Sequence, residues 1–291
     1  MAKLLVTGAT GMLGCTLVPK LQTCGHTVIR HGFSGIADAN VDLSNENSTK
    51  AMLDQFKPDC IINLAALANV DACESNPQSA YLLNLAVVDN LCRWIKVHSP
   101  TCHLIHLSTD QLYDGLGPHQ EDRIVIRNTY AFSKAAAELA VAGVGHTIIR
   151  TNFFGKSRCQ HRVSFSDWIY KNLCLNLPLS VFDDVLFSPL SMETLSTLIE
   201  HLVQQRPTGI FNLGSCEGMS KADFSFAFAR ALGLPDFNLH RCPSSERVGI
   251  SAYRPKDMRM DCSRFESSTG LKLPKLSDEI ILMRSAYLEA A

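Results

Sequence analysis

The stretch Leu4-Leu5-Val6-Thr7-Gly8-Ala9-Thr10-Gly11-Met12-Leu13-Gly14 decides the fold. A short apolar run leads directly into glycines at every third position, and an apolar helical pattern follows. Strand, glycine turn and helix start together are the context that a dinucleotide-binding loop requires. Its first glycine permits the tight turn, its second lets backbone N–H groups approach a pyrophosphate, and its third allows the helix to pack closely on the sheet. We therefore predict a cofactor-binding loop, with an ordinary glycine turn as the alternative, in which the contacts come from Gly8, Gly11, Met12, Leu13 and Gly14.

Apolar runs of four to six residues recur along the chain, separated by segments of helical periodicity. The runs are Leu4 to Thr7, Thr27 to Arg30, Cys60 to Leu64, His103 to Leu107, His146 to Arg150 and, later, Gly209 to Leu213. Continuous apolar strands are typical of a parallel sheet covered by helices on both faces. The pattern predicts an α/β fold, a Rossmann-type doubly wound parallel sheet with a smaller C-terminal substrate-binding lobe.

The helices expected between these strands span residues 12–24, 48–56, 77–98 and 128–143. Asn47 or Ser48 can cap the second helix, and Pro77 suits the first turn of the third. The regular alternation loosens after Gly155. We therefore predict an NAD(P)-binding domain over residues 1–155 and a substrate-binding lobe over residues 156–291 that is interleaved with the end of the sheet.

Composition excludes several classes of protein. The 291 residues carry 27 Lys and Arg against 28 Asp and Glu, and no run of basic residues suggests a nucleic-acid partner. No apolar stretch is long enough to span a membrane, and the glycine turn comes too early for a signal peptide, so we expect a cytoplasmic protein. The eleven cysteines form no Cys-x-x-Cys pair and the ten histidines are scattered, so we expect no metal site.

The residues after the second strand bear on the choice between NADP and NAD. An acidic residue about 20 positions past the glycine loop usually binds the ribose of NAD, whereas an arginine accommodates the 2′-phosphate of NADP. This chain has Arg30, followed by His31, which favours NADP(H), with NAD as the second choice. Asp42 and the neighbouring Leu43 are expected at the adenine edge, although a capping or surface role for Asp42 is an equal alternative.

A phenol and an ammonium group lie four residues apart in Tyr130-Ala131-Phe132-Ser133-Lys134. On a helix they share one face and can act on one ligand. A nearby ammonium favours the phenolate, lowering the pKa of the tyrosine and making proton transfer feasible near neutral pH. Ser108 and Thr109 follow an apolar strand, at the sheet edge where ligands bind, and either can donate a hydrogen bond to a carbonyl oxygen.

These motifs occur in the order seen in dTDP-4-dehydrorhamnose reductases. Besides the glycine loop, Ser108-Thr109-Asp110 and Tyr130 with Lys134, the matching motifs are Asn63-Leu64-Ala65-Ala66, Val70-Asp71-Ala72-Cys73-Glu74 and Arg254-Pro255. The chain resembles this branch of the extended short-chain dehydrogenase/reductase family over nearly its whole length. The resemblance implies NAD(P)H-dependent reduction of the C4 ketone of a nucleotide-linked 6-deoxysugar, with a catalytic set of Thr109, Tyr130 and Lys134. It also implies that Ala65 and Ala66 line the nicotinamide side of the cofactor and that Asn84 lies in the helix beneath the site.

The departures from the family pattern concern the substrate. The reductases usually have Tyr where this chain has Gln111, and an aromatic Trp where it has Asn152-Phe153-Phe154. Ser108, Gln111, Asn152, Phe153 and Arg254 are the expected substrate contacts. Arg254, Lys256 and Arg259 could clamp a diphosphate, because arginine matches phosphate oxygens, or could form a solvated basic loop.

Three other functions are compatible with this resemblance to different degrees. A sugar-nucleotide 4,6-dehydratase needs an acidic base where Gln111 stands, and an amide cannot accept the proton, so elimination is disfavoured. An epimerase would use the same tyrosine and lysine. A non-catalytic regulatory subunit is also open, because the fold resembles the β subunit of methionine adenosyltransferase and fold does not fix function. The expected partner is a small nucleotide-sugar substrate, and a homodimer is a further possibility.

Overall fold

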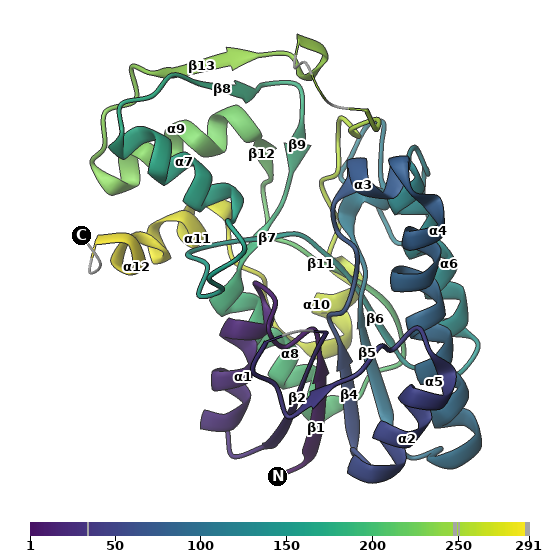
Figure 1. Cartoon of the computed structure of the whole chain (residues 1–291). Helices are drawn as coiled ribbons and strands as arrows, with labels where there is room; N and C mark the ends of the chain where they lie inside the picture. Colours follow the sequence, from purple (N-terminus) through teal and green to yellow (C-terminus); the bar gives the residue numbers. More distant parts are fainter. Residues whose placement is uncertain (34, 247–248, 250, 289–291) are drawn as a thin grey trace. The chain divides into compact units, whose positions relative to one another are not determined.

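A seven-stranded sheet forms the centre of the fold, in the order β11-β6-β5-β4-β1-β2-β3 (Figure 1). The pairings from β6 across to β3 are parallel. The computed structural model describes residues 1–33, 35–246, 249 and 251–288. The strands are β1 (Lys3–Thr7), β2 (Thr27–Gly32), β3 (Ala39–Asn40), β4 (Cys60–Asn63), β5 (His103–Leu107), β6 (Thr147–Thr151) and β11 (Gly209–Leu213).

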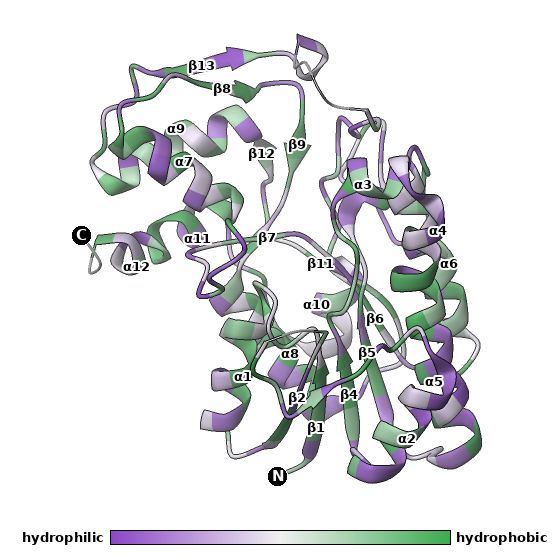
Figure 2. Cartoon of the chain, in the orientation of Figure 1, coloured by the Kyte–Doolittle hydropathy of each residue, from purple (hydrophilic) through white to green (hydrophobic). Residues whose placement is uncertain are grey.

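The central strands are buried and largely apolar because helices cover both faces of the sheet. Every residue of β4 and β5 is buried, and Figure 2 shows both strands largely in the hydrophobic colour. Helices α1 and α8 lie on one face, and α2, α5 and α6 lie on the other (Figure 1). The parallel, doubly wound sheet is therefore as predicted, and each of the six predicted strands matches an observed strand to within two residues at either end.

The chain divides into two compact units. The first unit comprises residues 1–109, 128–150 and 196–211, and the second comprises residues 110–127, 151–195 and 212–291. The helices whose residues fall wholly or partly in the first unit are α1 (Gly14–Thr23), α2 (Glu46–Phe56), α3 (Val70–Ser75), α4 (Pro77–Ala80), α5 (Val87–His98), α6 (Thr129–Ala142) and α8 (Met192–Gln205).

Two helix predictions were wrong in detail. The cap of α2 is Asn45, whose side chain accepts a hydrogen bond from the Ser48 backbone, so neither Asn47 nor Ser48 is the cap. The helix predicted over residues 77–98 is interrupted by a π-helical turn, η1 (Tyr81–Ala86). Such turns are frequent at functional sites, and apolar periodicity does not reveal them because the flanking segments stay helical.

The second unit has its own hydrophobic core, in which Phe154, Phe224, Phe228 and Tyr287 pack together. Its elements are η2 (Asp110–Leu112), β7 (Phe153–Phe154), α7 (Phe165–Cys174), β8 (Leu179–Phe182), β9 (Leu186–Phe187), β10 (Leu190–Ser191), β12 (Met219–Ser220), α9 (Lys221–Leu232), β13 (Leu239–Cys242), η3 (Ser244–Glu246), α10 (Ser263–Thr269), α11 (Leu276–Leu282) and α12 (Arg284–Leu288). None of the helices in the described residues combines the length and apolarity needed to cross a bilayer.

Candidate active site

The glycine loop joins β1 to α1 and is shaped by close backbone contacts. Gly8 has a φ of +65°, in the left-handed region that favours glycine. A Cβ on Gly14 would lie 2.5 Å from the Ala9 carbonyl oxygen, so no side chain fits there. At Gly11 a Cβ would meet only the Gly8 oxygen, at 3.1 Å, among the described residues. A side chain at Gly11 would thus crowd the turn that leads into α1, where a helix N-terminus favours an anion and a pyrophosphate is expected to bind.

The end of β2 carries an ion pair that the sequence did not reveal. The Asp38 carboxylate accepts hydrogen bonds from Arg30 Nε (3.1 Å), from Arg30 Nη2 (2.8 Å) and from the Arg30 backbone (2.8 Å). These bonds lower the pKa of Asp38 and raise that of Arg30. The Ala9 amide donates to the His31 carbonyl at 2.9 Å, which ties the glycine loop to this strand end. Any anion that uses Arg30 must therefore compete with Asp38.

Asp42 and Leu43 take part in the turn before α2. Asp42 Oδ1 accepts hydrogen bonds from the Ser44 amide at 2.9 Å and from the Ser44 hydroxyl at 2.7 Å. Leu43 is buried in the core, and its carbonyl accepts a bond from Asn90 Nδ2 at 2.9 Å. Asp42 thus stabilises the turn before α2, and its contact with the adenine stays a prediction.

The loop after β4 is held by the π-helical turn. Asn84 Oδ1 accepts from the Leu67 amide at 2.7 Å, and Asn84 Nδ2 donates to the Leu67 carbonyl at 3.2 Å and to Ser133 Oγ at 2.9 Å. Asn84 thus links this loop to helix α6 through hydrogen bonds. Ala65 and Ala66 lie in the same loop, half-buried.

Helix α6 presents Tyr130 and Lys134 in the same unit. Asn128 caps the helix by accepting a hydrogen bond from the Ala131 amide. Tyr130 is 8% exposed and Lys134 is 2% exposed. Ser108 and Thr109 follow β5 directly and are buried, and within the described residues no hydrogen-bond partner is found for Ser108 Oγ. A buried hydroxyl in that state is available to a ligand.

The Lys134 amine has two close neighbours on β5. It donates to the Leu107 carbonyl at 2.6 Å and lies 3.3 Å from His106 Nε2. Burial lowers the pKa of Lys134 to about 8, and the Glu138 carboxylate opposes that shift. Glu138 is itself paired with Arg150 of β6 through bonds of 2.6 to 3.2 Å. Lys134 is thus an ammonium at neutral pH and loses its proton when the pH rises slightly above neutral.

The expected substrate contacts in the second unit are engaged with their neighbours. Gln111 Nε2 lies 3.3 Å from Met258 Sδ, and Asn152 Nδ2 donates to Asp110 Oδ2 at 2.6 Å. Phe153 is half-buried in β7. Of the three basic residues near the C-terminus, Arg254 Nη1 donates to the Ala252 carbonyl, Lys256 pairs with Asp184, and Arg259 pairs with Asp257. These pairings leave the diphosphate clamp a prediction.

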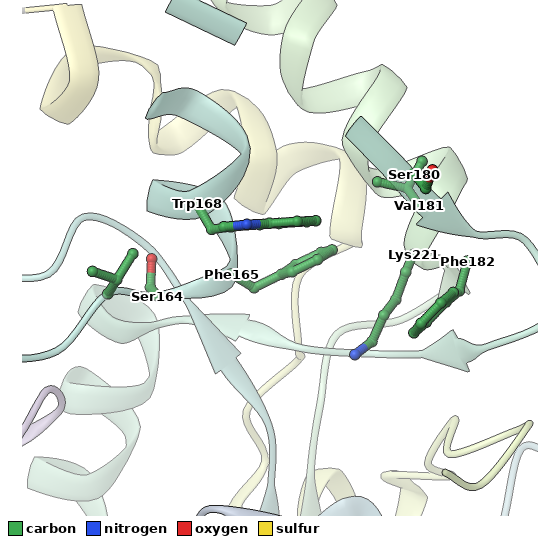
Figure 3. Close-up of a pocket in the computed structure, with 8 residues that line it drawn as sticks. Ser164, Phe165, Trp168, Ser180, Val181, Phe182 and Lys221 are labelled. Carbon is green, nitrogen blue, oxygen red and sulfur yellow. The ribbon is translucent and has the colours of Figure 1, made fainter. Parts of the chain in front are cut away.

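A pocket of about 300 Å³ lies within the second unit. The rings of Phe165 and Trp168 are stacked, with their centroids 5.9 Å apart. The Lys221 side chain lies between Phe165 and Phe182 (Figure 3). The remaining lining residues are Val163, Ser164, Ser180 and Val181. Sequence reasoning missed this pocket, although the spacing of Phe165 and Trp168 in a helical segment was a visible signal. Stacked aromatic faces beside a lysine suit a flat, anionic ligand.

The parallel sheet, the glycine loop, and Tyr130 with Lys134 on α6 define a Rossmann-type protein of the extended short-chain dehydrogenase/reductase class. The family model described as "RmlD substrate binding domain" matches residues 2–287. The chain belongs to this family.

Two curated relatives match nearly the whole chain. The "probable low-salt glycan biosynthesis reductase Agl14" of Haloferax volcanii is 28% identical, over 97% of each chain. The "methionine adenosyltransferase 2 subunit beta" of Xenopus laevis is 29% identical, over 90% of this chain and 81% of that one. Both the reductase and the regulatory-subunit interpretations therefore have a named relative at similar identity.

A solved structure shows the same fold. The dTDP-4-dehydrorhamnose reductase of Bacillus anthracis, in complex with NADP, has a TM-score of 0.87 at 22% identity and covers 97% of this chain and 98% of that one. The family and fold predicted from the sequence are confirmed, and the oxidoreductase class agrees with the reductase names among the relatives.

Proposed function

We propose that this chain is an NAD(P)H-dependent reductase of the C4 ketone of a nucleotide-linked 4-keto-6-deoxysugar, acting as dTDP-4-dehydrorhamnose reductases do. The observation that carries the proposal is the buried Lys134, held against the Leu107 carbonyl one helical turn after Tyr130. Ser108 and Thr109 directly follow β5, whose last residue, Leu107, accepts a hydrogen bond from the Lys134 amine. Reduction of a carbonyl requires a proton donor, which we assign to Tyr130, together with an ammonium group and hydroxyl donors.

Each residue has a defined task in this mechanism. When bound, the nicotinamide cofactor would supply hydride, and the loop of Gly8, Gly11 and Gly14 would hold the cofactor's diphosphate. Tyr130 delivers a proton to the carbonyl oxygen, and the Thr109 hydroxyl holds that oxygen. The Lys134 ammonium favours the phenolate that Tyr130 becomes.

A panel of nucleotide-linked 4-keto-sugars, incubated with NADPH and with NADH and followed at the nicotinamide absorbance, tests the reaction. We expect at least one sugar to be reduced. If none is reduced while NADPH binds well, the non-catalytic regulatory subunit becomes the better account, and the 29% identity to a methionine adenosyltransferase β subunit supports that second candidate. Incubation with a nucleotide sugar that carries a C4 hydroxyl separates an epimerase, which inverts C4 without net use of cofactor, from a reductase, which consumes one NADPH for each ketone. Size-exclusion chromatography with light scattering tests the predicted homodimer.

Asp38 is expected to weaken the preference of the protein for NADPH over NADH. Asp38→Asn removes the charge that engages Arg30, so NADPH should bind about two- to fivefold more tightly while the affinity for NADH stays unchanged, because exposed ion pairs are worth about 0.2–1 kcal/mol. Calorimetry with both cofactors measures the ratio. Asp223→Asn breaks another exposed pair, with Arg241, and is the matched control. If Arg30→Ala leaves the ratio unchanged, Arg30 is not the 2′-phosphate ligand.

The pocket of the second unit is proposed to receive the base of the substrate nucleotide. Trp168→Ala removes a stacking face, and base stacking on an aromatic ring is worth about 1–3 kcal/mol, so the Kd for dTDP should rise roughly 5- to 150-fold. Phe237→Ala removes an aromatic ring that is 67% exposed and lies outside the pocket lining, and it should leave the Kd unchanged. If calorimetry gives the same Kd for dTDP in the Trp168→Ala variant and in the unchanged protein, the base binds elsewhere.

A further inference from the structure

Three fully buried polar side chains occupy one rung of the central sheet. Thr7 on β1 stands opposite Asn63 on β4, and Asn63 stands opposite His106 on β5. All three are 0% exposed. Polar groups at such positions cost free energy unless they are hydrogen-bonded, so a row of three needs a reason.

The row is a continuous chain of hydrogen bonds. The Ala65 amide donates to Thr7 Oγ1 at 3.3 Å, and Thr7 Oγ1 donates to Asn63 Oδ1. Asn63 Nδ2 lies 2.9 Å from His106 Nδ1, and His106 Nε2 lies 3.3 Å from Lys134 Nζ. This series of polar contacts therefore extends from the loop expected to line the nicotinamide to the amine of the candidate catalytic lysine.

We propose that His106 is a positioning residue for Lys134, held in place by Asn63 and Thr7, so that the amine keeps one fixed orientation against the Leu107 carbonyl. This inference rests on the proposed function, because it assigns Lys134 its task there. An amine on a flexible four-carbon stem is otherwise free to rotate, and two fixed partners on one strand remove that freedom.

The state of the imidazole follows from its surroundings. Burial and the Lys134 ammonium lower the pKa of His106 well below its usual value, so the ring is neutral at physiological pH. A neutral ring has one donor nitrogen and one acceptor nitrogen. With the Asn63 amide donating to Nδ1, the ring hydrogen lies on Nε2, from which it can be donated to the neutral amine of Lys134 but not to its ammonium form. Rotation of the Asn63 amide by half a turn exchanges its oxygen and nitrogen and would let Nε2 accept from the ammonium instead.

Other charges around the amine are accounted for in the described part of the chain. Tyr130 and Glu138 share helix α6 with Lys134, His106 faces it from β5, and Arg150 of β6 is bound to Glu138. The Glu138 charge is paired with Arg150, and the imidazole is the side-chain partner of the amine, which also bonds to the Leu107 carbonyl. A change at His106 should therefore register directly in the titration of Lys134.

The test compares two amides in place of the imidazole. In His106→Asn the amide reaches the position of Nδ1, so the bond to Asn63 is kept and the contact with Lys134 is lost. In His106→Gln the amide reaches the position of Nε2, so the contact with Lys134 is restored. The matched control is His103→Asn, the same change at another buried histidine of β5, whose Nε2 bonds to Thr147.

The first readout needs neither cofactor nor substrate. Lysines labelled with ¹³C at Cε are followed by NMR against pH, with the Lys134 signal assigned from Lys134→Arg. We expect a midpoint of about 8 in the unchanged protein. His106→Asn should shift it by about one unit, because a hydrogen bond to a charged group is worth about that much. A downward shift means that Nε2 accepts from the ammonium and an upward shift means that it donates, and either supports the proposal.

The second readout is turnover as a function of pH. His106→Asn should lower kcat about tenfold and move the Lys134 limb of the pH profile, His106→Gln should recover most of both, and His103→Asn should change neither. If both His106 variants fold and keep the Lys134 midpoint within about 0.2 unit of the unchanged protein, the proposal is overturned, whatever the protein reduces. If the Lys134 midpoint shifts in His106→Asn but the unchanged protein reduces no keto-sugar, the proposed function is wrong and the positioning role of His106 is still supported.

Discussion

Tyr130→Phe should lower the turnover of ketone reduction about 10²- to 10⁴-fold while the affinity for NADPH stays within about twofold. The substitution removes one oxygen from a residue that is 8% exposed and leaves the ring in place, so the fold should be unchanged. The phenol is the proton donor in the proposed mechanism, and general acid catalysis contributes rate increases of this size. Steady-state kinetics on the best keto-sugar, with cofactor Kd from calorimetry, measures both quantities.

The control is Tyr81→Phe, the same change at a tyrosine that is 55% exposed on the π-helical turn. It should leave kcat unchanged. Near-normal turnover of the Tyr130→Phe variant would end the catalytic interpretation of this residue. If both tyrosine variants lose most of their kcat, the loss would reflect a structural effect of Tyr→Phe changes in these helices, and it would not identify Tyr130 as the proton donor.

Lys134→Met separates the two members of the pair. Burial lowers the pKa of Lys134 to about 8, so the ammonium is present below that pH and is lost as the pH rises through it. Turnover of the unchanged enzyme should therefore fall through a limb near pH 8, and that limb should be missing in Lys134→Met. Cofactor affinity should fall as well, whereas Tyr130→Phe leaves it intact.

The sequence was sufficient for the fold because local and long-range signals agree there. The glycine loop lies between a strand and a helix, and the continuous apolar runs of β4 and β5 are those of strands buried on both faces. The signals that define Tyr130 and Lys134 are also local, since four residues on one helix face suffice to bring two groups together. Their catalytic roles stay predictions.

What the sequence did not reveal depends on the register of strands that are distant along the chain. Thr7, Asn63 and His106 are separated by 43 residues or more, and only the pairing of β1, β4 and β5 places them on one rung. Asp38 reaches Arg30 because the chain turns back after β2, and no periodic pattern records that return. Single polar residues inside apolar strands are the available signal, and each one alone is ambiguous.

Gly11→Val should abolish cofactor binding in a protein that still folds. Gly11 does not have a positive φ, and within the described residues its added Cβ would crowd the Gly8 oxygen alone, at 3.1 Å, so that the Gly8 backbone has to move by a few tenths of an ångström. The rest of the isopropyl group would occupy the space above the start of α1, where backbone N–H groups are expected to meet the diphosphate. We expect no binding of NADPH or NADH at about 1 mM, with a circular dichroism spectrum like that of the unchanged protein.

Two other glycines set the limits of this experiment. Gly143→Val makes the same change at the end of α6, where a Cβ would lie 3.5 Å from the Ala140 oxygen in ordinary contact, and it should leave binding intact. Gly14→Ala should instead unfold or strongly destabilise the protein, because a Cβ 2.5 Å from the Ala9 oxygen forces the loop apart. Thermal unfolding followed by circular dichroism separates this outcome from a loss of binding alone. If Gly11→Val retains cofactor affinity, this loop does not cradle the diphosphate, whatever the other two variants do.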